Sequence, residues 1–134
     1  MQHWMEDQQV DSRFLMAVLL DTGTAAENFS QLARCFRGWG SEELERMARE
    51  SRAQWNCLGG IFSLVTGETP RRQTPVPDGG TAQIRLKKAY ARALHLLAAF
   101  EGKGQDPEYG PVFQRLAARQ QDHCRRILEI IGSL

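Results

Sequence analysis

Residues 113–131 read FQRLAARQQDHCRRILEII, and their apolar members recur at the three- and four-residue spacing of one helical face. That face consists of Phe113, Leu116, Ala117, Cys124, Ile127, Leu128 and Ile131. Gln120 and His123 fall on the same face, at positions where a helix packed in a core carries apolar residues. The stretch therefore predicts a core helix whose apolar face is interrupted by a polar pair.

The same spacing predicts a bundle of helices, over about residues 10–37, 42–66, 81–101 and 107–131. Ser41 followed by Glu42 predicts the N-cap and acidic first turn of the second helix. Asp106 and Pro107 predict the same features for the fourth helix. Because no stretch shows the alternation of a strand, we expect an all-α fold. From the length of the chain we expect a single domain over residues 1–134.

The segment between the second and third helices, residues 67–80, contains three prolines and three glycines, so it is neither helix nor central strand. Fourteen extended residues reach on the order of 40 Å, and a helix of about 25 residues is roughly 37 Å long. This linker can therefore run the whole length of the bundle. We expect a long crossover between helices 2 and 3, so that both point the same way.

Charge and cysteine content narrow the class of protein. The 17 basic and 16 acidic side chains are interspersed, so no field of one sign indicates a nucleic acid or an anionic membrane as partner. Cys35, Cys57 and Cys124 are widely spaced, which argues against a disulfide framework or a zinc knuckle. No signal peptide is visible, and no stretch approaches the ~18 uncharged residues of a membrane span. We expect a cytoplasmic protein that binds neither nucleic acid nor membrane.

Alignment of the four predicted helices by their middles brings a set of polar and small residues to one level: Thr22, Glu50 with Ala53, Ala93, and Gln120 with His123. In carboxylate-bridged di-metal bundles this level holds one Glu on each of two helices and Glu-x-x-His on each of the other two. The positions fit that arrangement, whereas most of the side chains do not.

In these segments the chain resembles the ferritin-like superfamily, and within it the rubrerythrin-like four-helix domains of anaerobic bacteria. The similarity spans about Leu15 to Ile131. It is strongest over residues 117–128, which resemble the family's last helix with its Glu-x-x-His, and over residues 106–113 before it. Residues 48–53 are similar to the family's second helix. The resemblance implies a ferritin-like four-helix bundle and, with a complete site, oxidoreductase activity at two iron ions.

Of the six ligand positions of the family, only Glu50 and His123 match, and the other four are occupied by Thr22, Ala53, Ala93 and Gln120. One carboxylate and one imidazole cannot hold two ions. We therefore expect a non-catalytic structural or interaction protein with no cofactor. A register one residue later would instead put Ser51 and Gln54 on the motif of the second helix and leave His123 alone.

Three interpretations of the polar pair remain open. Gln120 and His123 can hydrogen-bond Thr22, Glu50 or each other in a structural polar layer. Alternatively, Glu50 and His123 form a metal or redox site with fewer ligands than the family's, for iron, manganese or zinc, and the chain is an oxidoreductase of the ferritin-like type. The candidate neighbours of such a site are Thr22, Gln120, Cys57 and Cys124. The third interpretation is a polar pocket for a small organic ligand.

Two expectations concern partners. Helical bundles of this kind often pair through helix faces, so we expect a homodimer. The run Pro70-Arg-Arg-Gln-Thr-Pro75 is an extended proline-rich strip with two arginines, and it is a candidate docking strip for an unidentified protein partner.

Overall fold

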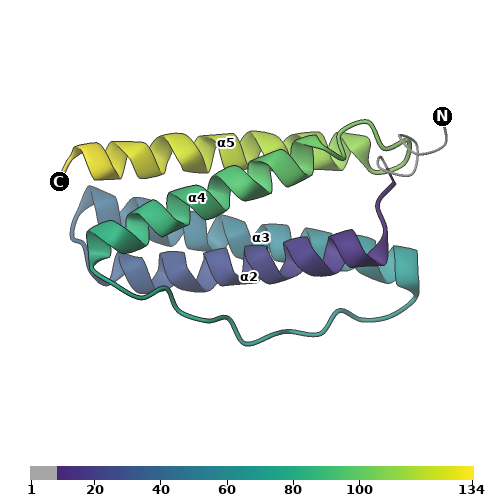
Figure 1. Cartoon of the computed structure of the whole chain (residues 1–134), viewed down its shortest axis with the longest axis horizontal. Helices are drawn as coiled ribbons and strands as arrows, with labels where there is room; N and C mark the ends of the chain where they lie inside the picture. Colours follow the sequence, from purple (N-terminus) through teal and green to yellow (C-terminus); the bar gives the residue numbers. More distant parts are fainter. Residues whose placement is uncertain (1–8) are drawn as a thin grey trace.

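The computed structural model describes residues 9–134, which form four helices and no strand (Figure 1). The helices are α2 (Ser12–Ala33), α3 (Trp39–Thr66), α4 (Ala82–Glu101) and α5 (Gly110–Gly132). The expected all-α class is thus confirmed for these residues. None of these helices combines the length and the apolar character needed to cross a membrane.

Each helix packs against two neighbours. α2 packs extensively along α3, and α4 along α5, while α2 also contacts α4 and α3 contacts α5 less closely. α2 and α5 run in one direction and α3 and α4 in the other, so neighbouring helices are antiparallel (Figure 1). Residues 67–80 pass along the outside of the bundle from the end of α3 to the opposite end, where α4 begins.

The hydrophobic core consists of two clusters, one toward each end of the bundle. The first is centred on Phe29, Leu44, Met47, Leu86 and Ile127. The second is centred on Leu15, Leu58, Leu96, Phe100 and Phe113. Between these levels lie buried polar residues of three helices, namely Thr22, Ser51, Gln54, Gln120 and His123. We call these five residues the polar layer. The interruption expected from the sequence of α5 therefore extends across the core.

The turn between α2 and α3 differs from the expected one. α2 ends at Ala33 instead of residue 37, and α3 already begins at Trp39, so the prediction of Ser41 as N-cap is wrong. The Ser41 hydroxyl instead donates a hydrogen bond to the carbonyl oxygen of Ala33 at 2.8 Å, which adds to the longer backbone hydrogen bond of 3.5 Å from Phe36 to the same oxygen. Gly38 occupies the N-cap position with φ 64°, a left-handed conformation that glycine adopts without a steric penalty.

α5 also begins later than expected, at Gly110 instead of residue 107. The Asp106 carboxylate accepts hydrogen bonds from the N–H groups of Glu108 at 3.0 Å and Tyr109 at 2.7 Å, so it caps the turn before the helix. A Cβ atom at Gly110 would lie 2.6 Å from the carbonyl oxygen of Gly104. This close approach of two backbone segments requires glycine where α5 starts.

Candidate functional site

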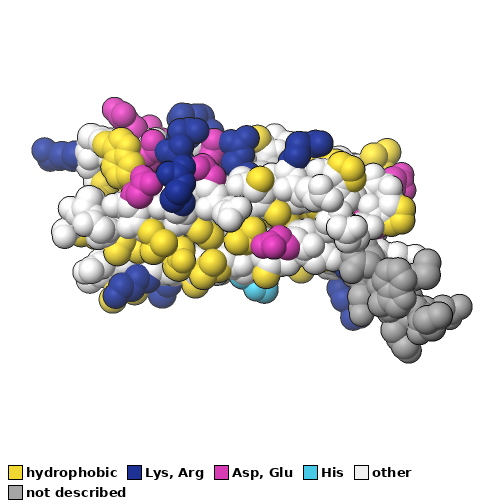
Figure 2. Space-filling view, turned by 90° about the horizontal axis from the view of Figure 1, so that it is seen from above, with side chains coloured by type: hydrophobic (Ala, Val, Ile, Leu, Met, Phe, Trp, Pro, Cys, Tyr) yellow, Lys and Arg dark blue, Asp and Glu magenta, His cyan; other side chains and the backbone are white. Residues whose placement is uncertain are grey.

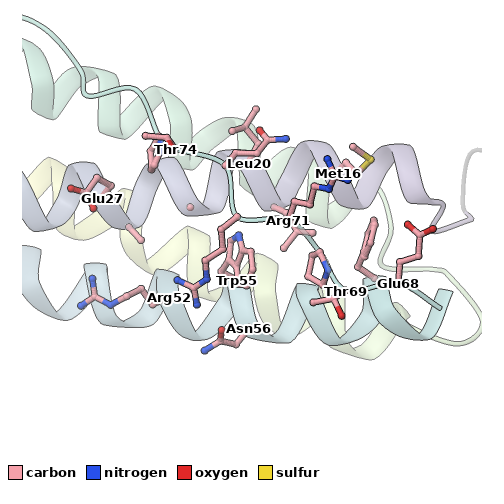
Figure 3. A pocket seen from close by; sticks show the side chains of 18 residues that line it. Met16, Leu20, Glu27, Arg52, Trp55, Asn56, Glu68, Thr69, Arg71 and Thr74 are labelled. Atoms are coloured by element: carbon pink, nitrogen blue, oxygen red, sulfur yellow. The ribbon is translucent and has the colours of Figure 1, made fainter. Parts of the chain in front are cut away.

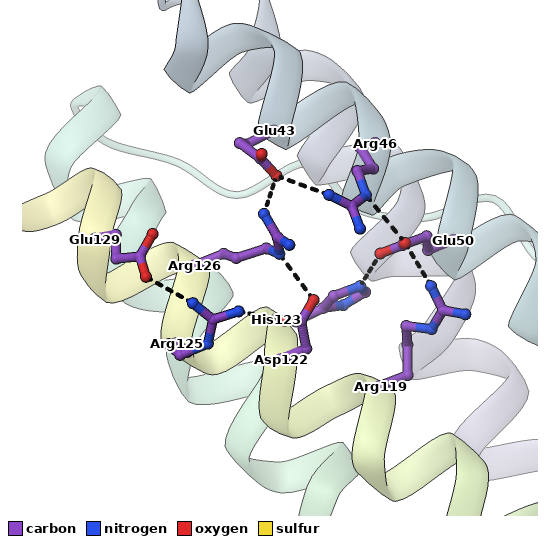
Figure 4. A network of polar contacts seen from close by, with 9 residues as sticks. All are labelled: Glu43, Arg46, Glu50, Arg119, Asp122, His123, Arg125, Arg126 and Glu129. Atoms are coloured by element: carbon purple, nitrogen blue, oxygen red, sulfur yellow. Dashed lines mark hydrogen bonds and ion pairs between the residues drawn. The ribbon is translucent and has the colours of Figure 1, made fainter.

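α3 and α5 meet through long polar side chains (Figure 4). We call this contact the α3–α5 seam, formed by Glu43, Glu50 and Gln54 of α3 with Arg119, Gln120, His123 and Arg126 of α5. The α3 residues follow one another at steps of seven and four, and the α5 residues at steps of one and three. They therefore lie on facing sides of the two helices. At one end of the seam, Arg126 donates to Glu43 at 2.6 Å.

His123 lies at the centre of the seam, with a fully buried side chain. Its Nε2 is 2.9 Å from Oε1 of Glu50, and its ring packs edge-on against Phe29, with ring centroids 5.7 Å apart. Because an ionised carboxylate only accepts hydrogen bonds, Nε2 is the donor of this pair. The other ring nitrogen, Nδ1, is buried and has no partner among the described residues.

The Glu50 carboxylate contacts two arginines and His123 at the seam. It accepts a hydrogen bond from Arg119, and its Oε2 lies 3.4 Å from Nε of Arg46. The hydrogen bond from His123 lowers the pKa of Glu50, and the charges of His123, Arg119 and Arg46 lower it further, against the opposing effect of partial burial. The side chain is 14% exposed, so Glu50 sits at the edge of the core in its ionised form.

A neutral pair lies next to this charged group. Nε2 of Gln120 donates to Oε1 of Gln54 at 2.6 Å, and both side chains are buried. The hydroxyl oxygens of Thr22 and Ser51 and the Nε2 of Gln54 are buried in the same layer and have no hydrogen-bond partner within residues 9–134. The polar layer therefore combines one direct amide pair with several unpaired polar atoms.

The inward row of α3 follows the later of the two registers considered from the sequence. Ser51 and Gln54 are buried, whereas Ala53, expected at the metal-ligand level, is exposed. The corollary that His123 would then stand alone is wrong, because the long side chain of Glu50 reaches it from the edge of the buried face. The buried row continues through Leu44, Met47 and Leu58, and extension of that row through position 54 is the signal that identifies Gln54.

The remaining candidate residues are distributed over the bundle. Thr22 and Ala93 are buried, as expected for their level. Cys57 is exposed on α3, while Cys124 is buried in the core cluster of Leu44, and this burial raises the pKa of its thiol. No group of three or more His, Cys, Asp or Glu side chains suited to a metal ion occurs within residues 9–134.

The arrangement brings together the two residues expected to ligate a metal, Glu50 and His123, and adds Gln54, Arg119 and Arg46 to them. Comparison of the chain with models of protein families, with curated proteins and with solved structures finds no match. Chemically, the seam offers charge-assisted hydrogen bonds between two helices and one imidazole nitrogen that has no partner within residues 9–134.

Proposed function

We propose that this chain is a non-catalytic bundle of the ferritin-like type that acts as a structural or interaction protein. In this proposal the side chains at the metal-ligand level join helices instead of holding ions. The observation that carries it is the environment of Glu50, whose carboxylate is already engaged by Arg119, Arg46 and His123. Guanidinium groups stay protonated in proteins, so a divalent cation at Glu50 would have to displace two side chains that carry a permanent positive charge.

The course of the chain supports the ferritin-like part of the proposal. In ferritin-like bundles one long crossover joins two helices that point the same way, and neighbouring helices are antiparallel. Residues 67–80 join α3 to α4 along the length of the bundle, and all neighbouring helices here are antiparallel.

The neutral residues of the polar layer support the non-catalytic part. Gln54 and Gln120 bond each other, and amide oxygens are weak neutral ligands compared with the carboxylates that iron and manganese prefer. Buried polar pairs can select one alignment of two helices, because a shifted alignment would leave the amides unpaired in an apolar surrounding. We therefore assign Gln54 and Gln120 the role of fixing how α5 lies along α3.

Metal analysis of the full chain tests this function. The protein is purified without chelators, incubated with Fe²⁺ or Mn²⁺ and freed of unbound ions. We expect substoichiometric metal and an unchanged melting temperature, since the seam is held by side chains. Two bound ions per chain would overturn the non-catalytic assignment.

A second candidate, a metal site of fewer ligands at Glu50 and His123, is favoured by one observation: Nε2 of His123 and Oε1 of Glu50 lie 2.9 Å apart, so loss of the proton between them would let both atoms contact one ion. A neutral imidazole nitrogen is the commonest metal ligand in proteins. This candidate expects one Zn²⁺, Fe²⁺ or Mn²⁺ per chain in calorimetric titrations and loss of that binding in His123→Gln. The absence of any ion binding to the unmutated chain would eliminate it.

We also propose that the chain forms a homodimer. On the face seen in Figure 2, with α5 toward the viewer, charged side chains gather along one side and hydrophobic side chains along the other. Leu94 of α4 is 43% exposed, and Leu128 of α5, which the sequence predicted on the core face, is instead 49% exposed because Ile130 takes the buried position. Because α4 packs along α5, these leucines support the outer surface of that helix pair as the contact between copies.

A further inference from the structure

A groove of about 790 Å³ lies between α2, α3 and the linker that crosses them (Figure 3). Linker residues 68–75 form one wall of the groove. The helices contribute a largely apolar floor that includes Met16, Leu19, Leu20, Ala26, Trp55 and Phe62. This volume is typical of a site for a small organic molecule.

Two glycines inside helices border the groove. A Cβ atom at Gly59 would lie 3.2 Å from Cγ of Pro70, so this glycine lets the linker approach α3 closely. A Cβ atom at Gly23 would lie 3.5 Å from Cδ1 of Trp55, which is an ordinary van der Waals contact, so Gly23 borders the indole ring. Glycine is unfavourable in a helix interior. Its use at position 59 is explained by the close packing of the linker.

Charged side chains surround this apolar floor. The cations are Arg52, Arg71 and Arg72, and the anions are Glu27 and Glu68. The Arg72 guanidinium lies over the ring of Trp55, 4.9 Å from its centroid. Arg52 and Arg71 form no hydrogen bond or ion pair with any residue in the described part of the chain. Arg71 extends from the linker toward Met16 (Figure 3), so its donors face the groove without a protein acceptor.

We propose that this groove binds an amphipathic organic carboxylate of the medium-chain fatty acid class. The alkyl chain would lie on the apolar floor, where burial removes it from water. The carboxylate would pair with Arg71, because a guanidinium presents two parallel N–H donors that match the two oxygens of a carboxylate. Three arginines and two glutamates leave the lining with a single excess positive charge, which suits a singly charged head group better than a phosphate.

This inference goes beyond the structural function proposed above and does not rest on it. The groove lies on the α2, α3 and linker side, and its ligand requires neither a metal ion nor the α3–α5 seam. Metal analysis and ligand binding therefore test the two proposals separately.

Calorimetric titration of the full chain with sodium decanoate, below its micelle concentration, is the first test. We expect one saturable site per chain. Decanol, with the same alkyl length and no charge, is expected to bind about tenfold more weakly because it lacks the charge-assisted pair with Arg71. In parallel NMR spectra, backbone amide shifts are expected at Gly23, Gly59 and along residues 68–75, and not in α4.

Two substitutions at solvent-accessible positions locate the site. Arg71→Gln removes the charged partner, and Leu20→Glu places an anion on the floor at a side chain that is already 42% exposed. Each is expected to weaken decanoate binding about tenfold or more. Arg49→Gln and Leu64→Glu, on exposed parts of α3 outside the groove, are the matched controls and are expected to leave the affinity unchanged.

Three results would each overturn the proposal. These are the absence of saturable decanoate binding, equal affinities for decanoate and decanol, and decanoate binding that survives both Arg71→Gln and Leu20→Glu. Circular dichroism of every variant, compared with the unmutated chain, separates a lost site from a lost fold. If Leu20→Glu loses helicity, Met16→Glu replaces it, since Met16 is 53% exposed and lines the same floor.

Discussion

Gln120 shows at the scale of a single residue why an amide suits the polar layer. Its side chain is 2% exposed and donates to Gln54, whose own Nε2 has no partner in the described part of the chain. A carboxylate of the same shape at this position would be a buried anion, and an unpaired buried charge is disfavoured strongly enough to shift its pKa upward.

We therefore expect Gln120→Glu to lower the free energy of unfolding at pH 7 by about 2 kcal/mol. Burial would raise the folded-state pKa of the new acid above its unfolded value of about 4.3. The loss is then absent below that pH, grows as the pH rises, and is constant above the folded-state pKa. Urea unfolding at pH 4 and pH 7, relative to the unmutated chain, measures this difference. Gln121→Glu, at the exposed neighbouring position, is the control and is expected to leave the free energy of unfolding unchanged. An equal loss at both pH values would contradict the explanation.

Glu50 has the opposite pH dependence, because its hydrogen bond with His123 and the nearby arginines lower its pKa below the ordinary value of a glutamate. The stability it contributes is present above the unfolded value and is lost as the pH falls through the folded-state pKa. Glu50→Gln is expected to lower the free energy of unfolding at pH 7 by about 1 kcal/mol, a modest amount because Arg119 and Arg46 are solvent-exposed and screened. The variant should also lose less stability between pH 5 and pH 3 than the unmutated chain. Glu45→Gln, at an exposed position of α3, controls for net charge.

At the scale of elements, the long linker is held by specific contacts near its C-terminal end. The N–H of Asp78 donates to Oδ1 of Asn28 on α2 at 2.8 Å, and the Asp78 carboxylate accepts from Arg92 on α4 at 2.7 Å. Lys88 of α4 donates to the carbonyl oxygen of Gly79 at 3.0 Å. These contacts join the linker to two helices at the point where α4 begins.

Substitution of glycine by alanine is expected to change the free energy of unfolding in opposite directions at the start of a helix and inside one. Gly110→Ala would place Cβ 2.6 Å from a backbone oxygen, so the turn before α5 must shift, and we expect a loss of about 2 kcal/mol in the free energy of unfolding. Gly60→Ala, inside the C-terminal part of α3, meets nothing within 4 Å and should gain about 0.5–1 kcal/mol. Denaturant unfolding of the two variants measures both signs. A gain at Gly110 would show that the Gly104 backbone yields easily.

At the scale of the whole molecule, the outer surfaces of the helix pairs differ in character. The side where α3 faces α5 carries the charged network, whereas hydrophobic side chains gather along the other side of the face in Figure 2. Leu94 of α4 and Leu128 of α5 are exposed. Exposed apolar side chains gathered on one face are favourable contacts for a second copy of the chain.

Sedimentation analysis is expected to find a dimer for the unmutated chain. Leu94→Glu should convert it to a monomer with unchanged helicity, because burial of two like charges across a symmetric contact is unfavourable. Leu64→Glu, at a side chain of α3 that is 76% exposed, is expected to leave the dimer intact. A monomer at all concentrations of the unmutated chain would contradict the dimer proposal.

Much of this fold follows from local features of the sequence. Apolar spacing predicts each of the four helices, and the prolines and glycines of residues 67–80 predict an extended linker long enough to span the bundle. The polar layer is also visible in part, since Thr22, Gln120 and His123 interrupt apolar faces at matching distances along their helices. Helix formation, helix breaks and position along a helix depend on neighbouring residues, so one sequence is enough to predict them.

The pairing of side chains across the bundle was decided only by the tertiary structure. One residue corresponds to a rotation of about 100° around a helix. A shift of one position therefore exchanged Ala53 for Gln54 in the core, while Glu50 stays at the edge of the buried face that the sequence predicts for it, where its length and charge bring it to His123 and Arg119. The groove beside Trp55 likewise exists because the linker crosses α2 and α3 at this level. Contacts of this kind depend on the rotation and separation of whole helices, which packing of the complete chain sets.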